Sequence, residues 1–273
     1  MTGIRTLGYL TLDAPPADTI DAAAAAGWSS VGIRITGRRR ADPYAQVIGN
    51  RAAIADLKKR AADQGLLLSN ISAYHFYPDV SLDDLARVMD TVIDLGSKIV
   101  VANSYDPDEG AYVEKLRRYC EHGRAAGVRV AVEFMKYSAV RSIHDAKRVI
   151  ERVGAPNLGY LIDPLHLARS GGTPADVRAA DPARIVFVQL CDARLPRREP
   201  TTDELRHEAR TGRLFPGDGE LPLPEFIAAL PPGTEIEYEV PRQDLAALTL
   251  AERARVAYSV CNAYLDAPAV AAA

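Results

Sequence analysis

Four successive strand-like runs between Val128 and Val240 each end in a polar side chain that could bind a cation or move a proton. These side chains are Glu133, Asp163, Gln189 and Glu239. An isolated polar residue at a strand end is usually a cap or a satisfied core group. Four in succession predict a shared site instead, because neighbouring strands of a closed parallel sheet bring their carboxyl ends together.

The chemistry of these four groups favours a divalent cation. Three carboxylates that face one another repel or are forced to bind protons, and a cation removes that cost. Ligation by carboxylate and amide oxygens favours Mn²⁺ or Mg²⁺ over zinc. His166 follows Asp163 by three residues. Taken alone it would be a loop or helix-cap histidine, but beside this site we expect it above the metal, in contact with the substrate.

Short apolar runs alternate with longer amphipathic stretches along the whole chain. The expected strands are Ile4–Leu10, Ser30–Ile35, Leu66–Ile71, Lys98–Ala102, Val128–Phe134, Leu158–Asp163, Ile185–Leu190 and Glu235–Val240. The expected helices include Asp18–Ala26, Arg51–Gln64, Leu82–Leu95, Ala111–Ala126 and Ser142–Val153. Glycines suited to end a helix follow them at Gly27, Gly65, Gly96, Gly127 and Gly154.

Eight strands, each followed by helix-like sequence, predict an α/β protein with a single (β/α)8 TIM barrel. The strands are nearly continuous apolar runs, which is typical of a sheet covered on both faces. A doubly wound open sheet is the main alternative, but the first strand–helix turn has no Gly-x-Gly-x-x-Gly pattern. No composition shift or long linker divides the sequence, so we expect one domain over residues 1–266 and a frayed tail at 267–273.

Composition limits the class of function. The chain has 273 residues, of which 25% are charged, and a net charge of −3, so it has no general attraction for nucleic acid or anionic membrane. The one basic run, Arg38–Arg40, is interpreted as a solvated loop. Three widely spaced cysteines argue against a disulfide framework. No signal-peptide pattern and no run of about 18 apolar residues is found, so we expect a cytoplasmic protein.

Several short segments match a known family pattern. They are Val132–Phe134, Leu161–His166, Phe187–Asp192, Pro216–Leu221 and Tyr238–Pro241. Through them the sequence resembles the xylose-isomerase-like TIM-barrel superfamily of sugar phosphate isomerases and epimerases over nearly its whole length. The resemblance implies that one divalent metal ion (Mn²⁺, Mg²⁺ or Co²⁺) is bound by Glu133, Asp163, Gln189 and Glu239. It also implies an acid/base pair, Glu133 and Glu239, and a substrate contact at His166.

The reaction implied by the resemblance is isomerisation or epimerisation of a sugar-like or hydroxy-keto substrate. The metal would polarise the carbonyl, a carboxylate would remove the neighbouring proton, and the metal would stabilise the enediolate. If a β-hydroxyl leaves instead, the same intermediate gives dehydration. Gln189 resembles hydroxypyruvate isomerases and 3-dehydroshikimate dehydratases, since many ketose epimerases have histidine there. Those dehydratases usually carry an arginine after the third strand, and Ser69–Phe76 contains none.

Residues outside the ligand set are expected to select a small-molecule substrate. The candidates are Tyr9, Arg34, His75, Asn103, Arg194, Arg197, Arg210 and Arg213. The arginine density between residues 194 and 213 favours an anionic substrate. Pro216–Gly219 is either a lid hinge or a tight turn. Barrels of this group often pair through their helices or mouth loops, which by analogy implies a homo-oligomer.

Glu237 shares a strand face with Glu239 and is therefore expected inside the barrel. A buried acid needs a partner, for which Arg34 is the candidate.

Two other classes of function can be weighed against an enzyme of this kind. DNA-repair endonucleases of the same superfamily use a histidine-rich zinc cluster. The chain has five histidines, and three of them fall in helical or variable segments (His122, His144, His207), which argues against a nuclease. A non-catalytic barrel that binds a sugar-like ligand through the same metal would not need two potential bases, so the pair Glu133 and Glu239 favours an enzyme.

Overall fold

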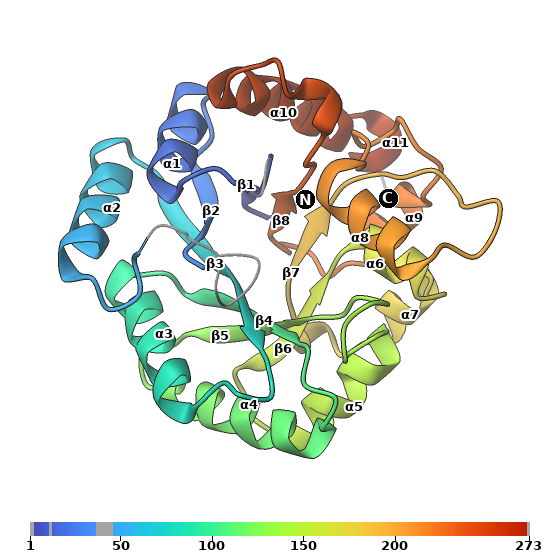
Figure 1. Cartoon of the computed structure of the whole chain (residues 1–273). Coiled ribbons are helices and arrows are strands. Elements are labelled where there is room, and N and C mark those ends of the chain that lie inside the picture. Colours follow the sequence, from blue (N-terminus) through green and yellow to red (C-terminus); the bar gives the residue numbers. More distant parts are fainter. Residues whose placement is uncertain (1–2, 11–12, 37–45, 272–273) are drawn as a thin grey trace.

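The computed structural model describes residues 3–10, 13–36 and 46–271. Eight parallel strands pair in chain order, and the last pairs with the first, so the sheet is a closed barrel. Helices surround the sheet as an outer ring (Figure 1). The predicted (β/α)8 barrel is therefore confirmed, while the predicted loop at Arg38–Arg40 lies outside the described residues.

The strands are β1 (Arg5–Leu7), β2 (Ser30–Arg34), β3 (Leu67–Phe76), β4 (Ile99–Ser104), β5 (Arg129–Glu133), β6 (Leu158–Ile162), β7 (Ile185–Leu190) and β8 (Ile236–Tyr238). The α-helices are α1 (Pro16–Ala25), α2 (Arg51–Asp63), α3 (Leu82–Leu95), α4 (Glu109–Arg124), α5 (Ile143–Val153), α6 (Pro164–Arg169), α7 (Pro174–Ala179), α8 (Thr202–Thr211), α9 (Leu223–Ala228), α10 (Leu250–Leu265) and α11 (Pro268–Ala271). Two 3₁₀ turns are η1 (Pro182–Arg184) and η2 (Gln243–Leu245).

Local sequence sets the ends of the helices as expected. Ser81 and Ser142 cap the N-termini of α3 and α5 with side-chain hydrogen bonds. Gly96 (φ 83°) and Gly154 (φ 69°) end these two helices in the left-handed conformation, which glycine adopts without steric cost. The strand bounds were predicted less well at β3, which continues to Phe76 instead of ending at Ile71.

The extension of β3 changes what lies at the mouth of the barrel. The pairing of β3 with β4 shifts register between Ile71 and Tyr74, and beyond the shift His75 pairs with Asn103. Both side chains then line the cavity described below.

On β4, β5, β6 and β7 the inward face changes from apolar to polar toward the carboxyl ends of the strands. Below the site, an apolar cluster fills the barrel: Ile99, Val101, Ala131, Leu161, Val186 and Phe187. Side chains two residues apart on a strand share a face. Val101, Ala131, Leu161 and Phe187 are each followed, two residues later, by a polar residue: Asn103, Glu133, Asp163 and Gln189. On β4 to β7 the inner side chains are therefore apolar below the site and polar at the site.

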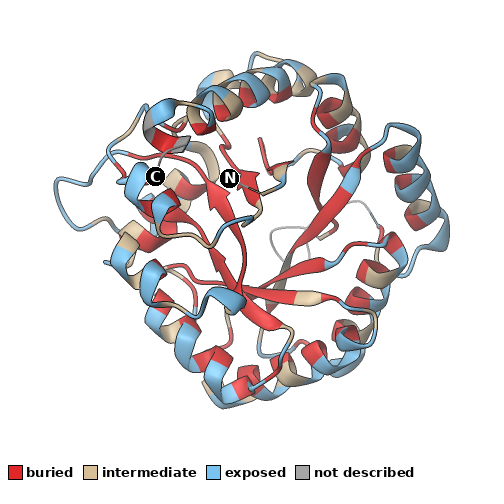
Figure 2. Cartoon of the chain, turned by 180° about the vertical axis from the view of Figure 1, so that it is seen from behind, coloured by how far each residue is buried: buried red, intermediate tan, exposed pale blue. Residues whose placement is uncertain are grey.

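A second, larger core lies between the strands and the helices. Figure 2 shows buried strands and helices whose exposed faces point away from the barrel. The Trp28 indole N–H donates to Ala254 O at 3.1 Å, which ties the end of α1 to α10 where the ring closes. The tail predicted to fray contains α11, and Val270 in it is buried. Among the helices in the described ranges, none has the length and apolar character needed to cross a membrane.

Candidate metal centre and active site

A cavity opens at the carboxyl ends of the strands. Its walls come from almost every strand of the barrel: Tyr9, Arg34, Ser72, His75, Asn103, Tyr105, Glu133, Met135, Tyr137, His166, Gln189, Ala209, Arg210, Arg213 and Glu239. This is the end of a TIM barrel at which chemistry is found.

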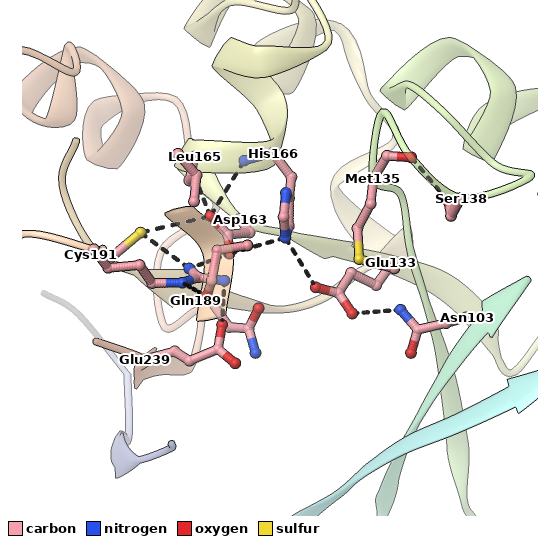
Figure 3. A network of polar contacts seen from close by, with 12 residues as sticks. Asn103, Glu133, Met135, Ser138, Asp163, Leu165, His166, Gln189, Cys191 and Glu239 are labelled. Atoms are coloured by element: carbon pink, nitrogen blue, oxygen red, sulfur yellow. Dashed lines mark hydrogen bonds and ion pairs between the residues drawn. The ribbon is translucent and has the colours of Figure 1, made fainter. Parts of the chain in front are cut away.

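Glu133, Asp163 and His166 form the tightest group of possible metal ligands among the described residues. One ligand atom of each lies within 4.8 Å of the other two. His166 Nε2 is 3.6 Å from Glu133 Oε1 and 3.9 Å from Asp163 Oδ2. Figure 3 shows His166 reaching from α6 toward Glu133, with Asn103 on the far side of that carboxylate. His166 was expected to contact the substrate, and this geometry makes it a candidate ligand as well.

Asp163 has two roles because it stands where β6 ends and α6 begins. Its Oδ1 accepts hydrogen bonds from the backbone N–H groups of Leu165 (2.7 Å) and His166 (3.4 Å), so it caps the helix. Its Oδ2 lies 2.5 Å from Arg213 Nη1. The cap fixes the carboxylate and starts the helix that carries His166, which explains why a buried strand ends in an acid followed by an imidazole.

Glu133 is held by Asn103, whose Nδ2 donates to Glu133 Oε2 at 2.5 Å. Burial raises the pKa of Glu133 to about 7, against the Asn103 hydrogen bond, which lowers it. Asn103 was expected to contact the substrate. In the structure, Asn103 holds the Glu133 carboxylate in place. The buried Oδ1 of Asn103 has no hydrogen-bond partner in the described part of the chain.

Arg213 lies between Asp163 and Glu239. Its Nη2 is 2.8 Å from Glu239 Oε2, although that oxygen is not in hydrogen-bonding geometry. The guanidinium is buried, with 3% of its side chain exposed. Two of the four predicted ligands, Asp163 and Glu239, therefore contact Arg213. Glu133 lies beside His166, and Gln189 lines the same cavity.

These neighbours set the charges of the site. Burial raises the pKa of Glu239 well above its usual range, and nearby carboxylates add to this effect against Arg213. Burial would also raise the pKa of Asp163, but Arg213 and His166 hold it below the ordinary value. Burial lowers the pKa of His166 to about 4, so its ring is neutral at pH 7.

The predicted substrate contacts divide into two groups. The residues that line the cavity are Tyr9, Arg34, His75, Asn103, Arg210 and Arg213, whereas Arg194 and Arg197 are exposed and do not line it. The reason is the course of the chain after β7. It runs outward through the exposed loop that holds Arg194 and Arg197 and returns along α8, whose end brings Arg210 and Arg213 to the mouth.

Some lining residues were missed by sequence reasoning. Tyr105 and Tyr137 follow the ends of β4 and β5, a position that could have marked them. The Tyr137 ring packs edge-on against His166, with ring centroids 5.8 Å apart. This ring contact helps to hold the imidazole in place.

The segment Pro216–Leu221 is bound to Asp192 rather than loose. The Asp192 carboxylate accepts backbone hydrogen bonds from Ala193 (2.8 Å), Gly217 (3.0 Å), Gly219 (3.0 Å) and Leu221 (3.1 Å). Its backbone also exchanges two 2.9 Å hydrogen bonds with Leu214, next to Arg213. This geometry favours the tight-turn interpretation of the segment over a lid hinge.

The residues present fit a divalent cation. The site is rich in carboxylate oxygen, and Gln189 Oε1 is buried with no hydrogen-bond partner in the ranges that the structure describes. An unsatisfied buried oxygen in a cavity wall is costly unless a ligand satisfies it. Oxygen donors with one imidazole suit a hard or borderline divalent metal.

The chain is similar in sequence to two kinds of curated enzyme. It is 23% identical to the 3-dehydroshikimate dehydratase of Pseudomonas putida over 239 residues, which cover 83% of this chain and 35% of that protein. It is 26% identical to the inosose isomerase of Halalkalibacterium halodurans over 159 residues, which cover 55% of this chain and 54% of that one. The chain therefore spans about a third of the length of the dehydratase that it matches.

A solved structure shows the same fold. The crystal structure of the IOLI protein with a bound zinc atom superposes with a TM-score of 0.80 at 18% identity, covering 96% of this chain and 98% of that one. The model of the xylose isomerase-like TIM barrel family matches residues 20–257. With the closed barrel and the cavity at its mouth, this match establishes that the chain belongs to the xylose isomerase-like TIM barrel family.

Proposed function

We propose that this chain is a divalent-metal-dependent isomerase or epimerase that acts on a sugar-like or hydroxy-keto substrate. The observation that carries the proposal is that two carboxylates, Glu133 and Glu239, line one cavity together with residues able to hold a cation. Such a pair can take a proton from one substrate carbon and return it to another carbon or to the opposite face.

The cation would be held by Glu133, Asp163, Gln189 and Glu239, with His166 as a further candidate. When bound, a divalent ion supplies Lewis-acid polarisation of the substrate carbonyl, which acidifies the neighbouring C–H group and stabilises the enediolate.

The residues of the chain supply the proton transfer. Burial raises the pKa of Glu133 to about 7, so this group can exchange a proton near neutral pH. Asn103 orients it by donating to Oε2. His166, neutral because burial lowers its pKa to about 4, can hydrogen-bond a substrate hydroxyl without adding charge. Arg213 places positive charge next to Glu239 in the cavity wall, where it would stabilise negative charge that develops on a substrate oxygen.

The cavity favours a substrate that carries an anionic group. Arg34, Arg210 and Arg213 line it together. Arginine binds carboxylate and phosphate oxygens through paired N–H groups. This supports the anionic small molecule expected from the sequence, with Arg34 and Arg210 in place of the exposed arginines of the loop after β7.

Dehydration of the 3-dehydroshikimate type is the second candidate. The observation in its favour is the extent of similarity, since the alignment with the Pseudomonas putida dehydratase covers 83% of this chain against 55% for the inosose isomerase. The first proton removal would be the same, followed by loss of a β-hydroxyl. Neither β3 nor the loop between β3 and α3 contains an arginine, so Arg34 on β2 is the candidate to bind the substrate carboxylate.

A screen in deuterium oxide tests both reactions. Manganese-loaded protein is incubated with keto-sugars, hydroxypyruvate and 3-dehydroshikimate. Deuterium at a carbon next to the carbonyl, seen by NMR, reports isomerase-type proton transfer, and new ultraviolet absorbance reports an aromatised dehydration product. The Glu133→Gln variant should lose turnover by about 10²–10⁴-fold. If this variant turned over substrate as fast as the wild type, the proposed role of Glu133 would be wrong.

A further inference from the structure

Glu237 lies directly beneath the cation site, and its partners are amides. The residue is fully buried. Asn70 Nδ2 donates to its Oε2, and Gln189 Nε2 donates to its Oε1 at 3.0 Å. Arg34, suggested from the sequence as its partner, instead donates from Nε to Thr36 O at 2.9 Å.

The barrel leaves room for this acid by omitting two side chains. A Cβ on Gly32 would overlap Glu237 Oε2 and lie 2.8 Å from Asn70 Nδ2. A Cβ on Gly8 would lie 2.7 Å from Glu237 Cγ. Both distances are below any normal carbon contact. The packing of β1 and β2 therefore holds the Glu237 carboxylate in one place.

In this layer, Asn70 and Gln189 both direct their amide nitrogens toward Glu237. Ser72 Oγ donates to Asn70 Oδ1 at 3.2 Å, which leaves Asn70 Nδ2 to face Glu237. A carboxylate accepts at both oxygens. Gln189 therefore satisfies Glu237 with its amide nitrogen and turns its amide oxygen the other way. In register, Gln189 and Glu237 are direct partners on β7 and β8, so the contact does not depend on a long side-chain reach.

The outward-facing atom of Gln189 is the one that can bind a cation. Gln189 lines the cavity, and its Oε1 is buried without a hydrogen-bond partner in the described chain. An amide oxygen coordinates divalent cations, whereas an amide NH₂ group does not. If the amide turned over, the site would present N–H groups to the ion.

We propose that Glu237 is a positioning residue that fixes the amide of Gln189 so that its oxygen, and not its nitrogen, faces the cation. This inference rests on the metal site of the proposed function. It assigns a role to an acid that touches neither ion nor substrate. Outer groups of this kind orient metal ligands, and their loss typically weakens metal binding by about 10–100-fold.

An exchange of acid and amide tests the proposal with isosteric changes. In Glu237→Gln, the donors Asn70 Nδ2 and Gln189 Nε2 meet a side chain with a single acceptor, so one contact becomes donor against donor. We expect Mn²⁺ affinity, measured by isothermal titration calorimetry, to fall about 10–100-fold.

In the double variant Asn70→Asp with Glu237→Gln, the new carboxylate at position 70 accepts from the new amide at position 237. The oxygen of that amide again accepts from Gln189. The affinity should return to within about threefold of the wild type.

Glu235→Gln is the matched control. Glu235 lies on the same face as Glu237 one layer lower, and its Oε1 accepts from the hydroxyls of Thr6 and Ser69, which can reverse their direction. This variant should bind Mn²⁺ like the wild type. Urea unfolding of each variant establishes that the comparison is made between folded proteins.

The outcomes separate this inference from the proposed function. A wild-type protein that binds no Mn²⁺, Mg²⁺ or Co²⁺ would overturn the metal site itself. A wild type that binds, with Glu237→Gln binding equally well, would overturn only the role of Glu237. If Glu237→Gln does not fold, the double variant decides, since it must fold and bind Mn²⁺ at near wild-type affinity for the proposal to stand.

Discussion

Arg213 Nη1 lies 2.5 Å from Asp163 Oδ2, and both groups are buried at the mouth of the barrel. The same guanidinium reaches Glu239, so one arginine lies between two of the carboxylates that were expected to bind a metal. Arg213 thus contributes positive charge to the site independently of any bound ion.

Arg213→Met should destabilise the protein by about 3–5 kcal/mol in the presence of EDTA, because it leaves the buried Asp163 carboxylate uncompensated and removes the positive charge beside Glu239. Saturating Mn²⁺ should recover part of that loss, so the metal-induced rise in Tm should be larger in the variant than in the wild type. Thermal unfolding with EDTA and with Mn²⁺ measures the difference. Arg210→Met, which changes an arginine on the same cavity wall, is the control. An equal rise in Tm for Arg213→Met and wild type would contradict the prediction.

Metal affinity should depend on pH through Glu133. Burial raises the pKa of Glu133 to about 7, so below pH 7 a proton must leave before the carboxylate can coordinate an ion. Apparent Mn²⁺ affinity should fall as the pH drops below 7, approaching about tenfold per pH unit for the one proton displaced from Glu133. The pKa of Asp163 is lowered, so this group stays ionised there. Calorimetric titrations from pH 5 to 8 test this, and an affinity independent of pH would exclude the coupling.

Asp192→Asn should loosen the segment that carries Arg213. Asparagine keeps one acceptor oxygen and turns an NH₂ group toward backbone N–H donors that Asp192 now satisfies. We expect a loss of about 1–3 kcal/mol for each donor left unpaired, together with faster proteolytic cleavage within residues 212–221. Asp218→Asn serves as the control, since Asp218 lies in the same turn with 59% of its side chain exposed. Equal cleavage of the two variants would show that Asp192 does not hold the turn.

The three cysteines should be unreactive in the folded protein. Each is fully buried, and burial raises the pKa of Cys120 and of Cys261 to about 12. At pH 8, iodoacetamide should modify them in urea but not in native buffer, as mass spectrometry can show. Rapid modification of native protein would contradict the burial of these thiols.

The same raised pKa values give a stability effect of known sign. The unfolded thiols ionise near their ordinary pKa of 9.0, while the folded thiols stay protonated until about pH 12. Their contribution to stability is therefore complete below pH 9 and is lost as the pH rises toward 12, by about 1.4 kcal/mol per pH unit for each thiol. Cys261→Ala should have a shallower alkaline loss of stability than wild type in urea unfolding.

The barrel and the positions of its polar residues were readable from the sequence. Apolar runs and stop glycines such as Gly96 and Gly154 are local signals, and they set most helix and strand ends correctly. Because parallel strands of a closed sheet end at one rim, the residues that end β5 and β7 had to meet there. The sequence therefore determined the architecture and the gathering of Glu133 and Gln189 at one cavity.

Only the tertiary structure decided the partners of these residues. Glu237 pairs with Asn70, which is 167 residues away in the sequence, and not with Arg34. This pairing depends on which inward side chains share one layer of the barrel. Arg213 reaches Asp163 across 50 residues because α8 turns the chain back, and Arg194 does not reach the cavity because the same loop runs outward. Such contacts are set by register and loop path, which depend on the whole closed sheet and leave no local pattern in the sequence.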